Sequence, residues 1–196
     1  MEALCKNVEH IKVIVAMQQS HAKIGGALET LNLKEVMEDA VRINRSGLDR
    51  RQIRLIRDYH PGIQVLVDRH KVLQILVNLL SNAQHALEQT PKAERRVTLS
   101  LFAPDAKRVC LRIRDNGIGI EPDNLNRIFT LGFTTRRDGH GFGLHNGANA
   151  AKEMGGSLCA QSDGLGQGAT FTLELPATPS PATEFNPNGA HHSQAV

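Results

Sequence analysis

Residues 95–120 constrain the fold of this chain more than any other segment, because two alternating stretches lead directly into a glycine-containing turn. The stretches "RRVTLSLFA" (95–103) and "KRVCLRIRD" (107–115) alternate apolar and polar residues with the period of half-buried strands. The linker "PDAK" suits a hairpin, and the second stretch runs into Asp115-Asn-Gly-Ile-Gly-Ile. Asn-Gly is a strong hairpin signal, whereas two glycines also let a backbone lie close to a flat ligand. The segment alone does not choose between these two interpretations.

The remaining patterns predict an α+β domain over residues 29–176. It is expected to be a two-layer α/β sandwich, whose mixed, mostly antiparallel sheet has helices on one face. Asp68 is expected to cap a long helix that Thr90-Pro91 closes. His60-Pro61-Gly62 is expected to be a turn. Helices are predicted at 33–48, 69–89 and 144–156, and strands at 30–33, 51–59, 63–68, 157–163 and 169–176.

The two ends of the chain differ from this domain. Residues 1–28 are predicted to form a helix with a heptad seam, which fits an ordinary amphipathic helix as well as one helix of a dimerising bundle. From residue 177 the chain is rich in Pro, Ala, Asn, Ser and His, and 177–196 is interpreted as a disordered tail or linker. The seam residues are Leu4, Val8, Ile11, Val15, Gln18 and Ala22.

Composition argues against several classes of function. The net charge of +3 comes from interspersed acids and bases, and the aromatic residues are one Tyr and six Phe. We therefore expect no nucleic-acid or membrane-surface partner. Cys5, Cys110 and Cys159 form no Cys-x-x-Cys pair, which favours a reduced, cytoplasmic chain over a disulfide scaffold or zinc site. No apolar run reaches the roughly 18 residues of a membrane span, and no signal peptide is expected.

Two asparagines in the predicted helix 69–89 are the first candidate site residues. Asn78 and Asn82 are four residues apart, so they share one helix face beside an apolar seam. Buried amides need partners, and these two either bridge neighbouring loops or present an oxygen to a hard cation such as Mg²⁺. His85 lies three residues further along the same face, where it can reach a phosphate.

A glycine-rich segment, "IFTLGFTTRRDGHGFGLH" (128–145), follows the two strands. Gly139, Gly141 and Gly143 precede a predicted helix, where backbone N–H groups and the helix dipole favour phosphate. The segment lacks the Gly-Lys-Ser/Thr of a P-loop and the preceding strand of a Rossmann motif. It is therefore interpreted either as a flexible surface loop or as a lid that orders on a ligand.

The last candidate segment, "GLGQGATFTLELP" (164–176), places Thr170 at the start of a strand after a glycine turn. In their order along the chain, these segments resemble the sequence boxes of the catalytic, ATP-binding domain of two-component sensor histidine kinases. That domain has the Bergerat fold and belongs to the superfamily of DNA gyrase, the heat-shock chaperone ATPases and the mismatch-repair ATPases. The matching ranges are Asn78–Ala86 (N box), Asp115–Gly119 (G1), Phe129–Thr135 (F), Gly139–Leu144 (G2) and Gly166–Phe171 (last box).

The resemblance implies a role for each box residue. Asp115 would accept a hydrogen bond from the adenine amino group, and Thr170 would touch the adenine side through its hydroxyl or a water. Asn82 would ligate Mg²⁺ with support from Asn78, and Arg136 would contact the triphosphate. The other expected ATP-site residues are His85 at the phosphates, Gly117 and Gly119 as clearance for the ring, Gly141, Gly143 and Leu144 as a phosphate cradle, and Ile120, Phe129, Thr134, Thr135, Gly139 and His140.

Position 78 also separates members of the superfamily. Hydrolysing relatives carry a Glu one turn before the metal-binding Asn, where it activates water as a general base, and an amide cannot accept a proton in this way. Asn78 therefore predicts poor ATP hydrolysis and retention of the γ-phosphate for transfer to a histidine. A response-regulator receiver domain is the expected later partner.

The acceptor histidine is expected outside this chain, because no histidine here is followed by Glu or Asp, the pattern of the family's acceptor site. Residues 1–28 resemble the second helix of the dimerisation domain that carries the acceptor. This favours the bundle interpretation and a homodimer through that helix. Two other functions stay open: a nucleotide-sensing interaction module without phosphotransfer, and a serine-kinase anti-sigma factor of the same fold, which would be expected to keep an acid at position 78.

Overall fold

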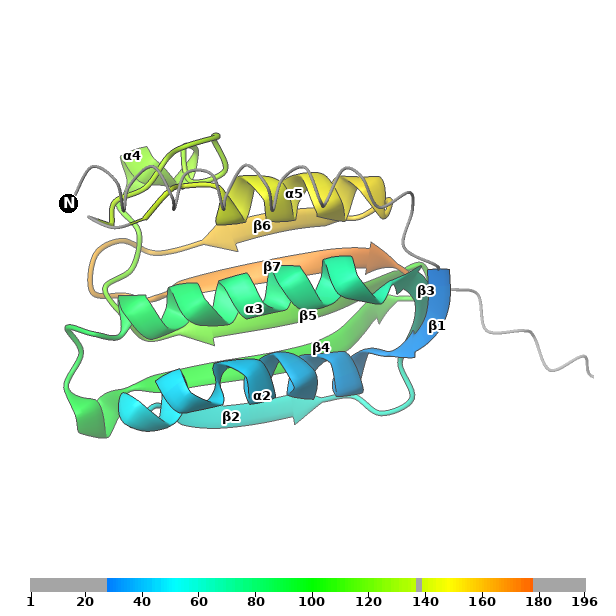
Figure 1. Ribbon diagram of the computed structural model, residues 1–196, viewed down its shortest axis with the longest axis horizontal. Coiled ribbons are helices and arrows are strands. Elements are labelled where there is room, and N and C mark those ends of the chain that lie inside the picture. The colour runs from blue at the N-terminus through cyan, green and yellow to red at the C-terminus, as the bar shows by residue number, and fades with distance from the viewer. Residues whose placement is uncertain (1–27, 137–138, 178–196) are drawn as a thin grey trace, which may run out of the picture.

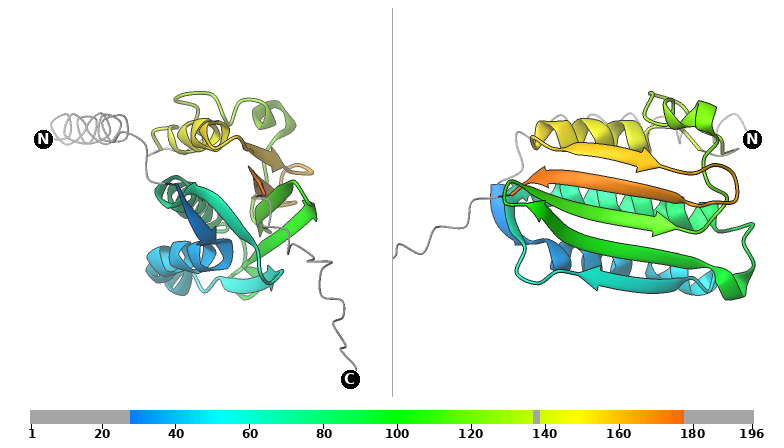
Figure 2. Two further views of the ribbon diagram at one scale, coloured as in Figure 1. Left: turned by 90° about the vertical axis from the view of Figure 1, so that its right-hand side faces the viewer. Right: turned by 180° about the vertical axis from the view of Figure 1, so that it is seen from behind.

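The domain consists of a layer of helices packed on one face of a twisted sheet (Figures 1 and 2). A computed structural model describes residues 28–136 and 139–177. The main sheet has the strand order β2-β4-β5-β7-β6, so the predicted α+β sandwich is confirmed. Its strands are β2 (Arg54–Tyr59), β4 (Arg96–Asp105), β5 (Arg108–Asp115), β6 (Ser157–Gln161) and β7 (Ala169–Pro176), and the covering helices are α2 (Leu33–Arg50), α3 (Arg69–Ala86) and α5 (Gly143–Glu153).

Strand pairing in the main sheet is antiparallel except at one edge. β4 and β5 form the predicted hairpin, but its turn is only Ala106-Lys107, because the strands extend to Asp105 and resume at Arg108. β5 pairs with β7, and β7 pairs with β6, both in antiparallel fashion. β2 pairs in parallel with β4 at the edge, which makes the sheet mixed, as the sequence predicted.

Two of the predicted strands form a separate sheet instead of joining the main one. β1 (Leu28–Asn32) pairs antiparallel with β3 (Gln64–Asp68) in a two-stranded sheet. The expectation of a single sheet is therefore wrong, because the turn after β2, with Gly62 at φ 76°, leads β3 away to the start of α3. The strand expected from residue 51 begins only at Arg54, since Gln52 adopts φ 54° in the turn after α2.

α3 is the central helix of the covering layer and lies between α2 and α5 (Figure 1). Asp68 caps it as predicted, because its Oδ1 accepts hydrogen bonds from the backbone N–H of His70 (2.9 Å) and Lys71 (3.3 Å). Within the described residues, no helix combines the length and apolar character that crossing a bilayer requires. The buried residues of α3 are Val72, Ile75, Leu76, Leu79, Leu80, Ala83 and Gln84.

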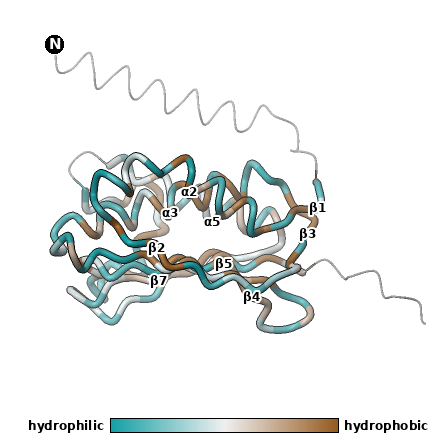
Figure 3. The backbone as a smooth tube through the Cα atoms, turned by 90° about the horizontal axis from the view of Figure 1, so that it is seen from below, coloured by the Kyte–Doolittle hydropathy of each residue, from teal (hydrophilic) through white to brown (hydrophobic). Residues whose placement is uncertain are grey.

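Among the described residues, helices cover only one face of the main sheet. In β5 and β7 the odd-numbered residues, such as Ile113 and Leu173, are buried against the helices, and the even-numbered ones face outward. In Figure 3 the strands of the sheet lie beneath the helical layer, and apolar residues recur along them. None of the described helices lies on the outer face (Figure 2, left). The alternation along each strand therefore decides which side chains reach the inner face.

Both ends of the described domain lie at the same end of the sheet. β1 begins at Leu28, and Ala177, just after β7, donates a backbone hydrogen bond to Lys107 O (2.8 Å) at the start of β5. The C-terminal ends of β5 and α3 lie at the opposite end (Figure 1). Apart from Leu28 and Ala177, the predicted helix at 1–28 and the predicted tail lie outside the described residues.

Candidate functional site

The structure gathers four chain segments at the end of the domain where β5 stops. The C-terminal end of α3, the turn after β5, the start of β7 and the N-terminal end of α5 meet there, at the left of Figure 1. Ile118 N donates to Ala86 O (2.9 Å), and Gly168 N donates to Gly117 O (3.1 Å), so the turn after β5 is fixed to α3 and to β7. All of the sequence boxes therefore contribute to one end of the molecule.

Asp115 is the buried acid of this site. It is the last residue of β5, lies on the inner face and is only 3% exposed. Its Oδ1 accepts a hydrogen bond from Gly117 N (2.9 Å). Burial raises the pKa of Asp115 to about 6, although backbone N–H groups of Gly117 and Ala169 act in the other direction. No ion pair between Asp115 and a cation occurs among the described residues, so its carboxylate suits a ligand that donates hydrogen bonds.

The two glycines after Asp115 are in close contact with neighbouring backbone. A Cβ at Gly117 would lie 2.4 Å from Ala86 O, and one at Gly119 would lie 2.0 Å from Gly164 O. Gly119 also has a φ of 74°. Close packing of backbone on backbone therefore requires glycine at both positions, and their role as clearance for a ligand ring stays a prediction.

The register of β7 corrects the role expected for Thr170. Thr170 is opposite Arg114, and Ala169 is opposite Asp115. Because opposite residues of a ladder share a face, Thr170 lies on the outer face and Ala169 lies beside the buried carboxylate. The expectation that the Thr170 hydroxyl reaches the same pocket as Asp115 is therefore wrong. The alternation of Ala169 with the buried Phe171 was a sequence signal that could have identified the inward residue.

The two asparagines of α3 face α5 and the glycine-rich segment before it (128–142), which we call the lid segment. Asn82 Oδ1 accepts a hydrogen bond from Arg136 Nη2. Asn78 lies against the first residue of α5, since a Cβ at Gly143 would be 2.3 Å from Asn78 Oδ1. Arg136 is half-buried, and this burial lowers its pKa. The structure thus brings together two residues of the N box, Asn78 and Asn82, with Arg136, which follows the F box, and Gly143 of the G2 box.

The N-terminal end of α5 presents backbone N–H groups that no capping side chain engages. Phe142 occupies the N-cap position and supplies no side-chain hydrogen bond to the first turn. Gly141, with φ 70°, packs on the lid backbone, where a Cβ would lie 2.4 Å from the carbonyl carbon of Gly132, and Gly132 N donates to Gly141 O (3.2 Å). Gly143 and Leu144 begin the helix, so their N–H groups are available to an anion, as a phosphate-binding helix requires.

The other predicted residues lie around this core of the site with weaker contacts. His85 is exposed, and its Nδ1 is 2.6 Å from Ser81 O of its own helix, so its phosphate contact stays a prediction. Several residues of the lid segment contact one another: Thr134 Oγ1 accepts a hydrogen bond from Arg136 N (3.1 Å), and a Cβ at Gly139 would lie 2.4 Å from the same oxygen. The ring centres of His140 and Phe142 are 6.4 Å apart. Thr135 is exposed.

Three polar residues that the sequence analysis left without a role hold the site together. Asn116 Oδ1 accepts from Arg96 N (2.8 Å), and its Nδ2 donates to Glu94 O (2.9 Å), which fixes the turn after β5 to β4. Ser162 Oγ accepts from Ile120 N (3.0 Å) and donates to Gly168 O (2.6 Å). His145 Nδ1 is 3.0 Å from Phe129 O, which joins α5 to the lid. These contacts are non-local, and no short sequence signal marks them.

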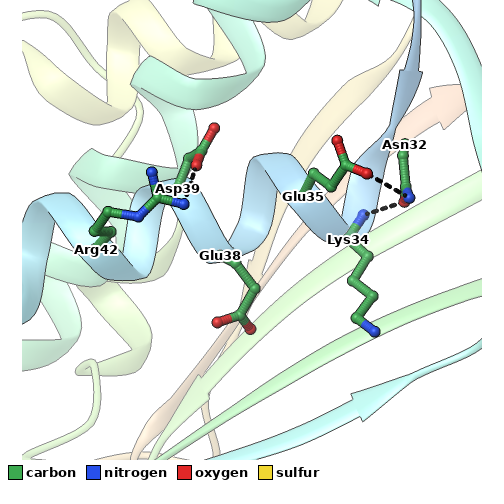
Figure 4. Close-up of a pocket in the computed structure, with 6 residues that line it drawn as sticks. All are labelled: Asn32, Lys34, Glu35, Glu38, Asp39 and Arg42. Carbon is green, nitrogen blue, oxygen red and sulfur yellow. Dashed lines mark hydrogen bonds and ion pairs between the residues drawn. The ribbon is translucent and has the colours of Figure 1, made fainter.

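A separate hollow of about 320 Å³ lies on the exposed side of α2 (Figure 4). Its carboxylates already have partners: Glu35 accepts from Asn32 Nδ2 (3.1 Å), and Asp39 pairs with Arg42 (2.8 Å). Glu38 binds Arg57 and Tyr59 on β2. We therefore assign no ligand to this hollow. It is lined by Asn32, Lys34, Glu35, Glu38, Asp39 and Arg42.

A sequence comparison identifies the family to which this arrangement belongs. The model of the family described as histidine kinase-, DNA gyrase B-, and HSP90-like ATPase matches residues 67–179. The chain belongs to this family. The match covers α3, β4, β5, the lid segment, α5 and β7, which together form the site described above.

Individual members of the histidine kinase-, DNA gyrase B-, and HSP90-like ATPase family are similar over most of the chain. The sensor histidine kinase ZraS of Salmonella typhimurium is 34% identical over 152 residues, which are 76% of this chain and 31% of ZraS. The sensor protein FixL of Bradyrhizobium diazoefficiens is 34% identical over 147 residues, which are 74% of this chain and 28% of FixL. The chain thus spans about a third of the length of these curated relatives.

Solved structures of the family have the same fold. The mycobacterial sensor histidine kinase MprB superimposes with a TM-score of 0.67 at 25% identity, and the match covers 78% of this chain and 99% of the solved MprB chain. Full-length ShkA in complex with AMPPNP superimposes with a TM-score of 0.70 at 28% identity and covers 81% of this chain and 33% of ShkA.

Proposed function

We propose that this chain binds ATP with Mg²⁺ and supplies the γ-phosphate for transfer to a histidine side chain, as the catalytic domain of a sensor histidine kinase. The family match, the sensor-kinase names of ZraS and MprB, and the AMPPNP complex of ShkA support this proposal. The acceptor histidine belongs to a dimerisation domain, and the phosphoryl group then passes to a receiver domain of a response regulator.

The described residues have the donors and acceptors that ATP needs. Asp115 has one carboxylate oxygen engaged by Gly117 N, which leaves the second oxygen for the amino group of adenine. The uncapped first turn of α5 supplies N–H groups for the phosphates. Arg136 donates to Asn82 on α3 and can exchange this hydrogen bond for one with a phosphate oxygen. Base and phosphates are therefore recognised at separate points of one site.

The donor set also fits a magnesium ion that is held jointly with the nucleotide. Among the described residues, no group of three or more His, Cys, Asp or Glu side chains is placed to hold a metal by itself. Mg²⁺ commonly binds through one or two protein oxygens together with phosphates and waters, and Asn82 Oδ1 is such an oxygen. When bound, the ion neutralises the charge of the phosphates. Asn78, against Gly143, positions the adjoining start of α5.

Asn78 is the observation that favours phosphotransfer over hydrolysis. Its amide lies at the start of α5, where phosphates are expected, and an amide cannot take a proton from an attacking water. A carboxylate there would be needed for efficient hydrolysis. Asn78→Glu is expected to raise ATP hydrolysis at least about tenfold, whereas Asn78→Gln is not. Equal hydrolysis by both variants would contradict this role.

The direct test mixes the chain with a separate dimerisation domain that carries an acceptor histidine. With ATP labelled at the γ-phosphate, we expect label on the added domain in an acid-labile form, and none on the chain alone. Label that stays on this chain would contradict the assignment of the acceptor. Tight ATP binding without transfer in trans would identify a nucleotide-sensing module instead.

A further inference from the structure

The outer face of the main sheet carries three arginines at the end where β5 stops. Arg54 on β2 is opposite Arg96 on β4, and Arg114 on β5 is opposite Thr98, the next outward residue of β4. Opposite residues of a ladder share a face, so the three side chains leave neighbouring points of one surface. All three are exposed. We call Arg54, Arg96 and Arg114 the arginine triad.

No ion pair among the described residues includes a member of the triad. Like charges directly opposite each other destabilise a sheet, and no carboxylate of the described residues forms an ion pair that offsets the repulsion. Residues that break such a local rule are commonly those that serve a function. The arginines that do form ion pairs are Arg42, Arg45, Arg51, Arg57, Arg69 and Arg108.

Arg112 extends this basic surface along β5. Its guanidinium carbon lies 4.7 Å from the ring centre of Phe102, and its buried Nε has no hydrogen-bond partner among the described residues. The acidic residues of the outer face lie toward its other end, where Asp58 is near the end of β2 and Glu174 pairs with Arg108. The outer face is therefore basic next to the end of β5 and balanced in charge at the other end.

We propose that the arginine triad, extended by Arg112, is a docking surface for an acidic segment of a partner protein. Exposed side chains on an uncovered sheet face do not enclose a small anion, but neighbouring strands hold them about 5 Å apart. Only Arg54 and Arg96 are directly opposite at this distance, whereas Arg114 is diagonal to Arg96, at roughly 7–8 Å. Both separations suit a row of carboxylates, each paired with a guanidinium. Nucleic acid is disfavoured, because Phe102 is the only outward aromatic of the described sheet and Arg112 already covers it.

The surface lies directly behind the candidate nucleotide site. Arg114 and Asp115 are consecutive residues of β5, and their side chains leave the strand on opposite faces. An acidic segment on the triad thus contacts the same strand end that carries Asp115 and leaves the inner face open. Since no triad residue faces the nucleotide site, docking does not depend on the proposed function.

The test measures binding of a labelled peptide of alternating Glu and Ser, about twelve residues long so that it spans the sheet, by fluorescence anisotropy. Replacing all three triad arginines by Gln is expected to weaken binding at least about tenfold at low salt. A control variant with the same charge change elsewhere is expected to bind within about twofold of the parent. The control replaces three exposed cations by Gln: Arg50, Lys107 and Lys152.

Equal binding by the two triple variants would overturn the proposal. Tighter binding of a single-stranded oligonucleotide or of phosphatidylserine vesicles than of the peptide would also overturn it, because the surface would then prefer another class of partner. Thermal unfolding tests a purely structural role. Relief of repulsion predicts that the triad variant is at least as stable as the parent at low salt, and a lower midpoint would refute the assignment. Nucleotide affinity of the triad variant is expected to be unchanged, so docking and ATP binding are tested separately.

Discussion

Replacing the buried acid Asp115 by Asn is expected to stabilise the domain while it weakens nucleotide binding. Burial raises the pKa of Asp115 from 3.8 to about 6, so the folded protein binds more protons than the unfolded chain between about pH 4 and pH 6. Stability therefore falls as the pH rises through this range, and the full cost of the buried charge is present above pH 6. A shift of about 2 units corresponds to about 3 kcal/mol, at about 1.4 kcal/mol per unit.

The Asp115→Asn side chain carries no charge, so the gain in the free energy of unfolding at pH 7 is expected to reach about 3 kcal/mol, or about 6–10 °C in melting temperature. The gain is expected to vanish near pH 4, where Asp115 is protonated. In the variant, the amide oxygen keeps the hydrogen bond from Gly117 N. The amide NH₂ group then faces the amino group of adenine, and two donors cannot form a hydrogen bond with each other. Affinity for ATP is then expected to fall by about two orders of magnitude.

Urea unfolding followed by circular dichroism between pH 4 and pH 7, with calorimetry for ATP, measures both effects. A variant less stable than the parent at pH 7, or a gain that does not change with pH, would refute the charge argument. Unchanged ATP affinity in the variant would refute the assignment of Asp115 to the base. Asp58→Asn, at an exposed position of β2, is the matched control and is expected to change neither quantity.

Three further substitutions test other parts of the structure. Gly117→Ala is expected to lower the free energy of unfolding by about 2–3 kcal/mol, because its Cβ would overlap the carbonyl of Ala86, and a loss below about 0.5 kcal/mol would contradict this packing. Thr170→Val is expected to leave ATP affinity within about twofold in calorimetry, since the side chain lies on the outer face; a large loss would restore the role that the sequence suggested. Asp68→Ala is expected to cost about 1 kcal/mol in thermal unfolding through loss of the α3 cap, and full stability would show that the cap is dispensable.

Local patterns predicted the parts of the fold that depend on neighbouring residues. The cap at Asp68 and the hairpin that ends at Asp115 follow from the helical and strand periods, because the side chains that decide them are close in sequence. The ordered boxes likewise identified the residues that meet at the end of β5. Each of these features depends on residues that are close together in the sequence.

The features that the sequence did not predict depend on contacts between distant segments. β3 pairs with β1 although α2 and β2 lie between them in the chain. No local signal in the sequence of β3 indicates which strand it will pair with. Gly117 is required by a carbonyl at the end of α3, about 30 residues earlier. The error at Thr170 is of another kind, because the alternation of β7 already indicated that Ala169 faces inward, whereas the resemblance to the last sequence box led to the choice of Thr170.

The two ends of the described domain lie far from the candidate site, so a rotation of the domain about these ends would displace the site. Leu28 and Ala177 lie at one end of the sheet, and the site lies at the other, separated by roughly the length of α3 (Figure 1). An 18-residue helix is about 27 Å long. A rotation of about 20° about the attached end would therefore carry the site through about 9 Å. Rotation of the whole domain would thus move the proposed nucleotide site by this distance without any change inside the site.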